Sequence, residues 1–554
     1  MRHGQGFNQI FQDYLSLVAQ APTGDVEPAP GFARYEPRFA YAPTDYLDAP
    51  GSGQSLTDTL GSLARLATQM HVAARKVSTS EGSLPGGYTY LGQFAIHDLV
   101  NSTGFRVTRD RNLPRGLFGN IQTPSLDLSS LYGGGPAGSP ALYQVIDDTE
   151  HRARFRLGYM TDQHGNPSVQ EDIARMPVGP WCGGAVGDAR FDPLLADTRN
   201  ADNLIISQLA VLFMQYHNML LDRAVDHVSA GKAHHPMLAN PFEAARCIVT
   251  ATYRRILRDD YLPRIVMPQV WARYFRDGAV PLGRVTLESA LAVLRFGHAQ
   301  VQDDYDFSVT HSDAGAGGVA RLGRLLDFFG LRPTGDVPVR DSWVIDWDLF
   351  FDPATPDPAR PLNRARPLGP ALVEPLRSHP ATRVAPPATV PELAGFRLGL
   401  AWRTLAKGLM GRLPTGQAAA RELVAQGLLD PAQVLGRDAL VAALRAGRTA
   451  GCIGERCLRD QDIDFLADRT PLFFYILAEA QAHGPTDAHL GPLGSDFVAE
   501  TFATALVDTG YAAERSLDAA ATALHTELYP DHGLPVTMPA LIARMRAHKA
   551  APVP

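Results

Sequence analysis

The segment Gly92-Gln93-Phe94-Ala95-Ile96-His97-Asp98 joins a side chain that can move protons to one that can hold a cation. Residues four apart share one face of a helix, so a helix here would point Gln93 and His97 the same way and Asp98 elsewhere. One segment can then serve two sites, with imidazole chemistry at the first and a cation at the second. The alternative is a structural His packed among apolar residues.

A second group of polar residues, Asp197-Thr198-Arg199-Asn200-Ala201-Asp202, directly precedes an apolar helical pattern that begins at Leu204. Arg199 carries a permanent charge on a planar fork of donors. Beside a catalytic His it could polarise a peroxide O–O bond, and its alternative role is a surface salt bridge. Asp202 stands where a helix N-cap is expected on structural grounds.

The third group is Arg295-Phe296-Gly297-His298, near the end of an apolar helical pattern. An imidazole in apolar surroundings is a sound axial ligand for haem iron. Gly297 removes side-chain bulk where a flat macrocycle would approach. A buried His at a helix end is the structural alternative.

The fourth group, Thr123-Pro124-Ser125-Leu126-Asp127-Leu128-Ser129, places side-chain oxygens at every second residue. An extended backbone would gather Thr123, Ser125, Asp127 and Ser129 on one face. Grouped oxygen donors suit Ca2+, and Asp98 would supply a second carboxylate. The structural alternative is that this segment forms a turn and binds no ion.

Helical periodicity indicates a mainly α protein with little β structure. Residues 21–55, rich in Pro and Gly, are expected to form an extended arm that follows a short amphipathic helix over residues 1–20. Residues 101–200 should be loops with short helices, and residues 352–395 a long irregular excursion. No clean linker divides the rest, so we expect an arm over residues 1–55 and one large domain over residues 56–554. Helices are predicted over residues 56–80, 204–227, 242–262, 286–302, 396–410, 417–447, 459–482 and 495–508.

Composition narrows the function classes. The chain has 554 residues, 45% hydrophobic and 20% charged, which is ordinary for a globular protein. A formal net charge of -7 argues against a dedicated nucleic-acid or anionic-membrane binder. No apolar run approaches the roughly 20 residues that cross a bilayer, and no secretory leader is evident, so we expect a cytoplasmic protein, with non-classical export left open. The four cysteines favour free thiols over a bridge between Cys452 and Cys457.

Taken together and in order, these segments resemble the animal-type haem peroxidase family of the peroxidase–cyclooxygenase superfamily, in a bacterial-like branch. The resemblance is strongest over residues 85–510, and the His217-Asn218 pair follows Arg199 at the family's spacing. The other family-like pieces are Tyr88-Thr89-Tyr90-Leu91-Gly92, Leu126-Asp127-Leu128-Ser129-Ser130-Leu131-Tyr132-Gly133, Ile345-Asp346-Trp347-Asp348, Leu413-Pro414-Thr415-Gly416-Gln417 and Leu490-Gly491-Pro492-Leu493-Gly494.

The resemblance implies a role for each candidate residue. His97 would be the distal acid–base residue, Arg199 the distal Arg and His298 the proximal ligand of the iron. Gln93 would line the distal pocket. The implied Ca2+ ligands are Asp98, Thr123, Ser125, Asp127 and Ser129.

Four positions depart from the family pattern. Ile96 stands where many members carry an Asp that forms an ester to haem, and it cannot bond. Asp202 replaces the Glu that forms the other ester, and Asn203 replaces a Met that links to haem in one subgroup. Thr404 occupies the place of the Asn that supports the proximal His. We therefore expect haem b, held without covalent links or by at most one ester.

The implied activity is reduction of hydrogen peroxide with electrons from a small phenolic, aromatic or halide donor. A fatty-acid dioxygenase of the same superfamily is the main alternative. Such dioxygenases use a Tyr three residues before the proximal His, and that residue here is Arg295. A specialised biosynthetic oxidase and a haem-binding protein without turnover are the remaining alternatives.

Overall fold

The structure is a computed structural model, and it describes residues 33–49, 53–74, 82–104, 118–146, 149–178, 190–308, 319–328, 339–353, 362–386, 390–449, 456–507 and 511–550. Helices dominate these residues and the sheets have only two or three strands, so the mainly α fold is confirmed. The predicted helix over residues 1–20 lies outside the described residues.

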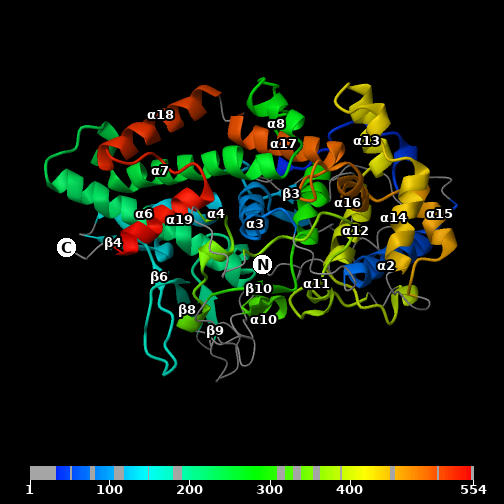
Figure 1. Ribbon diagram of the computed structural model, residues 1–554, viewed down its shortest axis with the longest axis horizontal. Coiled ribbons are helices and arrows are strands. Elements are labelled where there is room, and N and C mark those ends of the chain that lie inside the picture. Colours follow the sequence, from blue (N-terminus) through cyan, green and yellow to red (C-terminus); the bar gives the residue numbers. More distant parts are fainter. Residues whose placement is uncertain are drawn as a thin grey trace, which may run out of the picture.

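The helices form two groups on either side of α3 (Figure 1). The long helices α6 and α7 run side by side in one group with α18 and α19, and α2, α12, α14, α15 and α16 form the other. The helices are α2 Leu56–Ala74, α3 Gly87–Leu99, α4 Ser129–Tyr132, α5 Gly135–Gly138, α6 Leu204–Ser229, α7 Pro241–Arg255, α8 Pro268–Phe275, α9 Leu287–Leu291, α10 Leu322–Asp327, α11 Pro375–Ser378, α12 Leu400–Met410, α13 Gly416–Ala425, α14 Arg437–Thr449, α15 Asp460–Asp468, α16 Leu472–His483, α17 Pro492–Val507, α18 Tyr511–Leu528 and α19 Met538–Ala550.

Residues 101–200 differ from the prediction, because short antiparallel hairpins occupy much of this region. Strands this short carry too little alternation to be recognised in the sequence. One sheet has the order β1-β3-β2, and β4-β5, β6-β7, β8-β9 and β10-β11 form pairs. The strands are β1 Ala33–Arg34, β2 Ser102–Gly104, β3 Phe118–Asn120, β4 Tyr143–Ile146, β5 Thr149–Phe155, β6 Leu157–Gly158, β7 Asp172–Ile173, β8 Arg175–Val178, β9 Arg190–Pro193, β10 Asp304–Asp306 and β11 Val319–Arg321.

Several predicted helices are divided where Pro or Gly stops them. The helix expected over residues 417–447 becomes α13 and α14, with Gly427 at φ 69° after α13 and Pro431 in the connection. The helix expected over residues 459–482 becomes α15 and α16, separated at Pro471. Proline removes a backbone donor and Gly accepts a left-handed conformation, so both residues end helices.

The apolar residues build one large core that draws on the chain from Tyr35 to Met545. α6 lies inside it and is apolar on most of its faces, as expected for a core helix. Among the described helices, α6 alone is long and apolar enough to cross a membrane. The core helix of a globular protein passes the same test, and 94% of the most apolar window of α6 is buried inside the protein.

The described part of the N-terminal arm is bound to this core. The backbone N–H of Arg38 donates to the Glu288 carboxylate at 3.0 Å, and the Arg38 guanidinium pairs with Asp496 at 2.7 Å. Among the cysteines, Cys247 is a buried free thiol, whereas Cys457 takes part in a disulfide. The expectation of free thiols is therefore wrong for Cys457.

Candidate active site

One internal cavity collects most of the residues that the sequence singled out. Its walls come from α3, the start of α6, the π-helical turn Ile256–Tyr261 and the 3-10 helix η8 Val293–Ala299. Leucines from α10, α11 and α12 make much of the remaining surface apolar. The predicted residues that line the cavity are Gln93, Ile96, His97, Asp202, Asn203, Arg295, Gly297 and His298.

His97 is held by a hydrogen-bond chain that fixes its tautomer. The Asn200 amide donates through Nδ2 to the Ser130 carbonyl at 3.3 Å, which turns its Oδ1 toward His97 Nδ1 at 2.9 Å. An oxygen can only accept, so His97 carries its proton on Nδ1 and presents an unprotonated Nε2. Burial, followed by the nearby Arg199 charge, lowers the pKa of His97 to about 3. His97 is therefore a neutral base at physiological pH.

Contrary to the sequence prediction, Asp202 does not cap α6, because Asn203 is the N-cap of this helix. The Asn203 side chain accepts from the Ile206 N–H at 3.0 Å, and its Nδ2 donates to Gln93 Oε1 at 3.4 Å. The Asp202 carboxyl lines the cavity with Oδ2 3.9 Å from His97 Nε2. Burial raises the pKa of Asp202 to about 8, so this carboxyl is protonated at neutral pH.

Arg199 lies differently from its predicted place, since it is not among the cavity-lining residues. Its guanidinium donates to the carbonyls of Val100 at 2.5 Å and His97 at 2.7 Å, and its Nε donates to Asp197 at 3.0 Å. These carbonyls belong to the end of α3, where a helix leaves oxygens unpaired and attracts cations. Arg199 therefore fixes the backbone of His97 and acts on the cavity through its charge.

The cavity's other imidazole comes from η8, which replaces most of the α-helix predicted over residues 286–302. A 3-10 helix has three residues per turn, so Arg295 and His298 project to the same side and both line the cavity. Burial, followed by the charge of Arg295, lowers the pKa of His298 to about 3. A neutral imidazole is the form that binds a metal.

Thr404 does not support His298 as predicted. Its hydroxyl donates to the Leu400 carbonyl one turn earlier in α12, at 3.2 Å. His298 Nδ1 is buried and has no hydrogen-bond partner within the described part of the chain. A threonine hydroxyl within a helix often bonds the carbonyl one turn earlier, and the Thr404 hydroxyl makes that bond here.

Three basic side chains act electrostatically on His298, namely the buried Arg403 and the half-buried Arg295 and Lys407. Burial lowers the pKa of Arg295 and of Arg403 to about 10. Burial, followed by the positive charges of these two arginines, lowers the pKa of Lys407 to about 7. Buried charges require a counter-charge. A haem with its two carboxylates supplies such a charge, and its iron would meet the neutral His298. The residues present therefore fit haem.

Tyr261 approaches α3 closely and lines the same cavity. Its hydroxyl lies over Gly92, where any side chain would collide with it. The π-helical turn that carries Tyr261 also directs Asp260 to the Tyr88 hydroxyl at 2.8 Å. Such turns often mark functional sites. Sequence reasoning missed Tyr261 and Arg403, because nothing in their local patterns distinguishes them, and it passed over Asn200 within a segment that it had already selected.

On the other side of α3, Asp98 holds the oxygen-rich loop. Its carboxylate accepts from the backbone N–H groups of Leu128 at 2.8 Å and Ser130 at 2.9 Å. Burial, with a further contribution from Asp127, raises the pKa of Asp98 to about 6. Ser125 Oγ is buried without a hydrogen-bond partner in the described structure. Two repelling carboxylates and an unsatisfied hydroxyl fit a cation, although within the described residues no three His, Cys, Asp or Glu side chains cluster as a metal site.

The fold is mainly helical, and its cavity is lined by one imidazole from α3 and one from η8, with Arg295 and Arg403 beside them. Residues 100–322 match the sequence model of the family described as "Animal haem peroxidase", and this range includes Arg199 and His298. This match agrees with the family resemblance that the sequence predicted, over residues 100–322 of the chain. Members of this family bind haem.

Solved structures give the same fold. Peroxidase A from Dictyostelium discoideum matches with a TM-score of 0.52 and 14% identity over 93% of each chain. The fatty acid alpha-dioxygenase of Arabidopsis thaliana matches with a TM-score of 0.49 and 11% identity, over 95% of this chain and 85% of that one. The fatty acid alpha-dioxygenase of Oryza sativa matches with a TM-score of 0.47 and 11% identity, over 98% of this chain and 95% of that one. At 14% identity the likeness to peroxidase A shows the fold alone. No curated protein matches the chain.

Proposed function

We propose that this protein is a haem peroxidase that reduces hydrogen peroxide with electrons from small aromatic, phenolic or halide donors. The observation that carries the proposal is the neutral His97, whose Nδ1 is fixed by Asn200 and whose Nε2 faces the cavity that His298 also lines. Haem bound to His298 would supply the iron that receives peroxide and stores the oxidising equivalents. The side chains of the protein would then carry out the proton transfers.

His97 Nε2 would accept the first proton of peroxide and return it to the departing oxygen as water forms. Arg199 holds the His97 carbonyl and stabilises negative charge in the distal pocket from behind α3. Gln93, tied to Asn203, would orient the small molecule in the pocket. The protonated Asp202 stands beside His97 Nε2 without adding a negative charge.

An absorption spectrum taken before and after hydrogen peroxide tests the proposal. A Soret band that changes on addition of peroxide, and recovers when guaiacol, iodide or bromide is supplied, supports it. A protein that stays colourless after haem supplementation contradicts every haem-based function. A peroxide-independent reaction contradicts the peroxidase alone.

A fatty-acid dioxygenase is the second candidate function. Its support is the apolar wall of Leu322, Leu326, Leu376 and Leu400, next to buried cations such as Arg403 that would hold a carboxylate. Against it, Arg295 occupies the place expected for the radical-forming Tyr. Oxygen uptake with a long-chain fatty acid and no peroxide would favour this candidate over the peroxidase.

Acid–acetone extraction is expected to release the haem from the protein. Ile96 has no carboxyl group, and the Asp202 side chain is one methylene shorter than the Glu that it replaces, so no ester is expected. Released haem should show the mass of haem b. Haem that stays with the polypeptide contradicts the prediction, and an Asp202→Asn variant that then releases it would locate the bond.

We also propose that Ca2+ binds between Asp98 and the loop of Thr123, Ser125, Asp127 and Ser129. Removing the ion with a chelator is expected to lower the melting temperature and to weaken peroxidase activity, because the loop braces the helix that carries His97. Asp98→Asn should reproduce the loss and remove the response to the chelator. A chelator effect that persists in this variant would place the ion elsewhere.

A further inference from the structure

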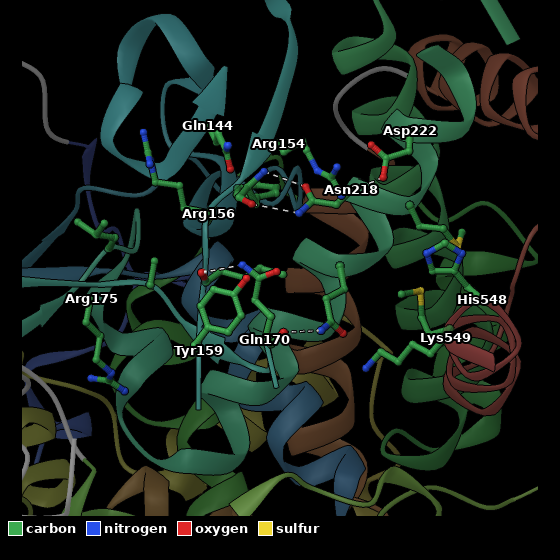
Figure 2. Close-up of a pocket in the computed structure, with 17 residues that line it drawn as sticks. Gln144, Arg154, Arg156, Tyr159, Gln170, Arg175, Asn218, Asp222, His548 and Lys549 are labelled. Carbon is green, nitrogen blue, oxygen red and sulfur yellow. Dashed lines mark hydrogen bonds and ion pairs between the residues drawn. The ribbon is translucent and has the colours of Figure 1, made fainter. Parts of the chain in front are cut away.

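A second pocket lies on the surface, between the β4–β5 hairpin, α6 and α19 (Figure 2). None of its lining residues lines the cavity described above. Tyr159 stands in it with 55% of its surface exposed, and Phe155 forms part of its wall. The pocket is therefore open to solvent and offers an aromatic face to a planar ligand.

The lining of this pocket is rich in cations. Arg154 pairs with Asp222 at 2.9 Å, and Lys549 pairs with Glu171. Arg156 is exposed and has no ion pair within the described residues. Arg175 keeps its Nε on Asp172 at 3.3 Å, but its Nη1 is buried without a hydrogen-bond partner in the described structure. An anion on an aromatic ligand is the chemistry that such a pocket accepts.

Beneath the pocket lies a tyrosine paired with a histidine. The Phe155 ring is 5.1 Å from the rings of both Tyr132 and His217, and Tyr132 Oη is 3.0 Å from His217 Nδ1. Both side chains are fully buried. Burial keeps the pKa of His217 low, at about 3, so the imidazole is neutral and its Nδ1 can accept the phenol proton.

The pair also connects to the cavity side of the molecule. Tyr132 follows Ser130, whose carbonyl accepts from the Asn200 amide that fixes His97. One turn before His217 in α6, Phe213 stacks on Phe94 of α3 at 5.5 Å, with the two rings 3° from parallel. The pair is therefore joined through the backbones of α4 and α6 to residues that contact α3, the helix that carries His97.

We propose that the surface pocket is a second oxidation site, for anionic aromatic donors too bulky for the cavity, with Tyr132 and His217 as its relay. The inference rests on the proposed peroxidase function, since haem oxidised by peroxide is the oxidant. Tyr132 loses one electron to that haem while its phenol proton passes to His217 Nδ1. The donor in the pocket then gives one electron to the tyrosyl radical, and the proton returns from His217. The donor is oxidised by one electron in each cycle.

Steady-state oxidation of ABTS, an aromatic disulfonate, is compared with that of guaiacol in the haem-loaded protein. Tyr132→Phe keeps the ring but removes the hydroxyl, so the ABTS rate should fall several-fold relative to the guaiacol rate. Tyr143→Phe is the matched control, because its hydroxyl donates to the Tyr132 carbonyl at 2.7 Å and meets no imidazole. Equal losses for both donors in Tyr132→Phe would overturn the proposal.

Two readouts do not depend on turnover. Electron paramagnetic resonance after peroxide should show a tyrosyl radical that Tyr132→Phe removes and Tyr143→Phe retains. Equilibrium dialysis without peroxide should show weaker ABTS binding by Arg156→Glu, a change at an exposed position that leaves the fold intact. An unchanged radical in Tyr132→Phe, or unchanged binding in Arg156→Glu, contradicts the inference. A wild-type protein that cannot oxidise guaiacol contradicts the peroxidase function instead.

Discussion

Replacing His97 with Ala is expected to lower peroxide-dependent guaiacol oxidation by about 10²–10⁴-fold, the range for loss of a positioned acid–base group. The described cavity lining presents two neutral imidazoles, and with His298 on the iron, His97 is the one left to act as a base, with Nε2 unprotonated and Nδ1 held by Asn200. Asp202 cannot replace it, because burial raises the pKa of this carboxyl to about 8 and leaves it protonated. The iron would still be held by His298, so the Soret band should remain.

The measurement is the second-order rate of the peroxide reaction, followed in the Soret region by stopped flow. His525→Ala is the matched control, since His525 is also buried but lies on α18, outside the cavity. Asn200→Ala should give an intermediate loss and a changed pH profile, because the imidazole would lose its fixed tautomer. An unaltered rate in His97→Ala would assign proton transfer to another group.

The sequence predicted the site best where local geometry decides which way a side chain points. Gln93 and His97 are four residues apart, so they face one cavity, and Asp98 faces the loop near residue 128. The spacing of residues 295 and 298 likewise places them together, although through a 3-10 helix and not the expected α-helix. Short-range periodicity survives such a change because both helix types bring residues three apart to the same side.

Long side chains and long-range partners could not be predicted in this way. Arg199 has a flexible stem, and its direction depends on where α3 ends, about a hundred residues earlier in the chain. Asn203 and Asp202 both suit an N-cap, and only the packed helix start decides which of them is used. Thr404 was expected to reach His298, but its hydroxyl had a nearer carbonyl within α12. In each case a competing contact outside the motif determined the outcome.

The family resemblance predicted the helical fold, and the structure adds the charge balance of the cavity. Arg295 was noticed in the sequence only as a missing Tyr, whereas in the structure it joins Arg403 and Lys407 around His298. Basic side chains withdrawn from water in this way destabilise the folded chain unless an anion offsets their charge. Haem binding is therefore expected to raise the melting temperature by linkage.

Replacing His298 with Ala is expected to abolish stable haem binding. The imidazole is the metal-binding group on η8, and its low pKa keeps it ready to coordinate at neutral pH. The cations would still attract the haem carboxylates, so the variant should bind haem weakly and lose it on gel filtration, together with the gain in melting temperature. A circular dichroism spectrum like that of the unloaded wild type would show that the fold is intact.

Added imidazole provides the decisive control for His298→Ala. The substitution leaves space where the ring stood, and free imidazole can enter it and coordinate iron, so the Soret band and part of the thermal stabilisation should return. His71→Ala removes another buried histidine, whose Nδ1 bonds the Val373 carbonyl and which does not line the cavity, so it should keep its haem. If His298→Ala retained haem through gel filtration, the iron ligand would have to be sought elsewhere in the cavity, and the peroxide chemistry assigned to His97 would lose its geometric basis.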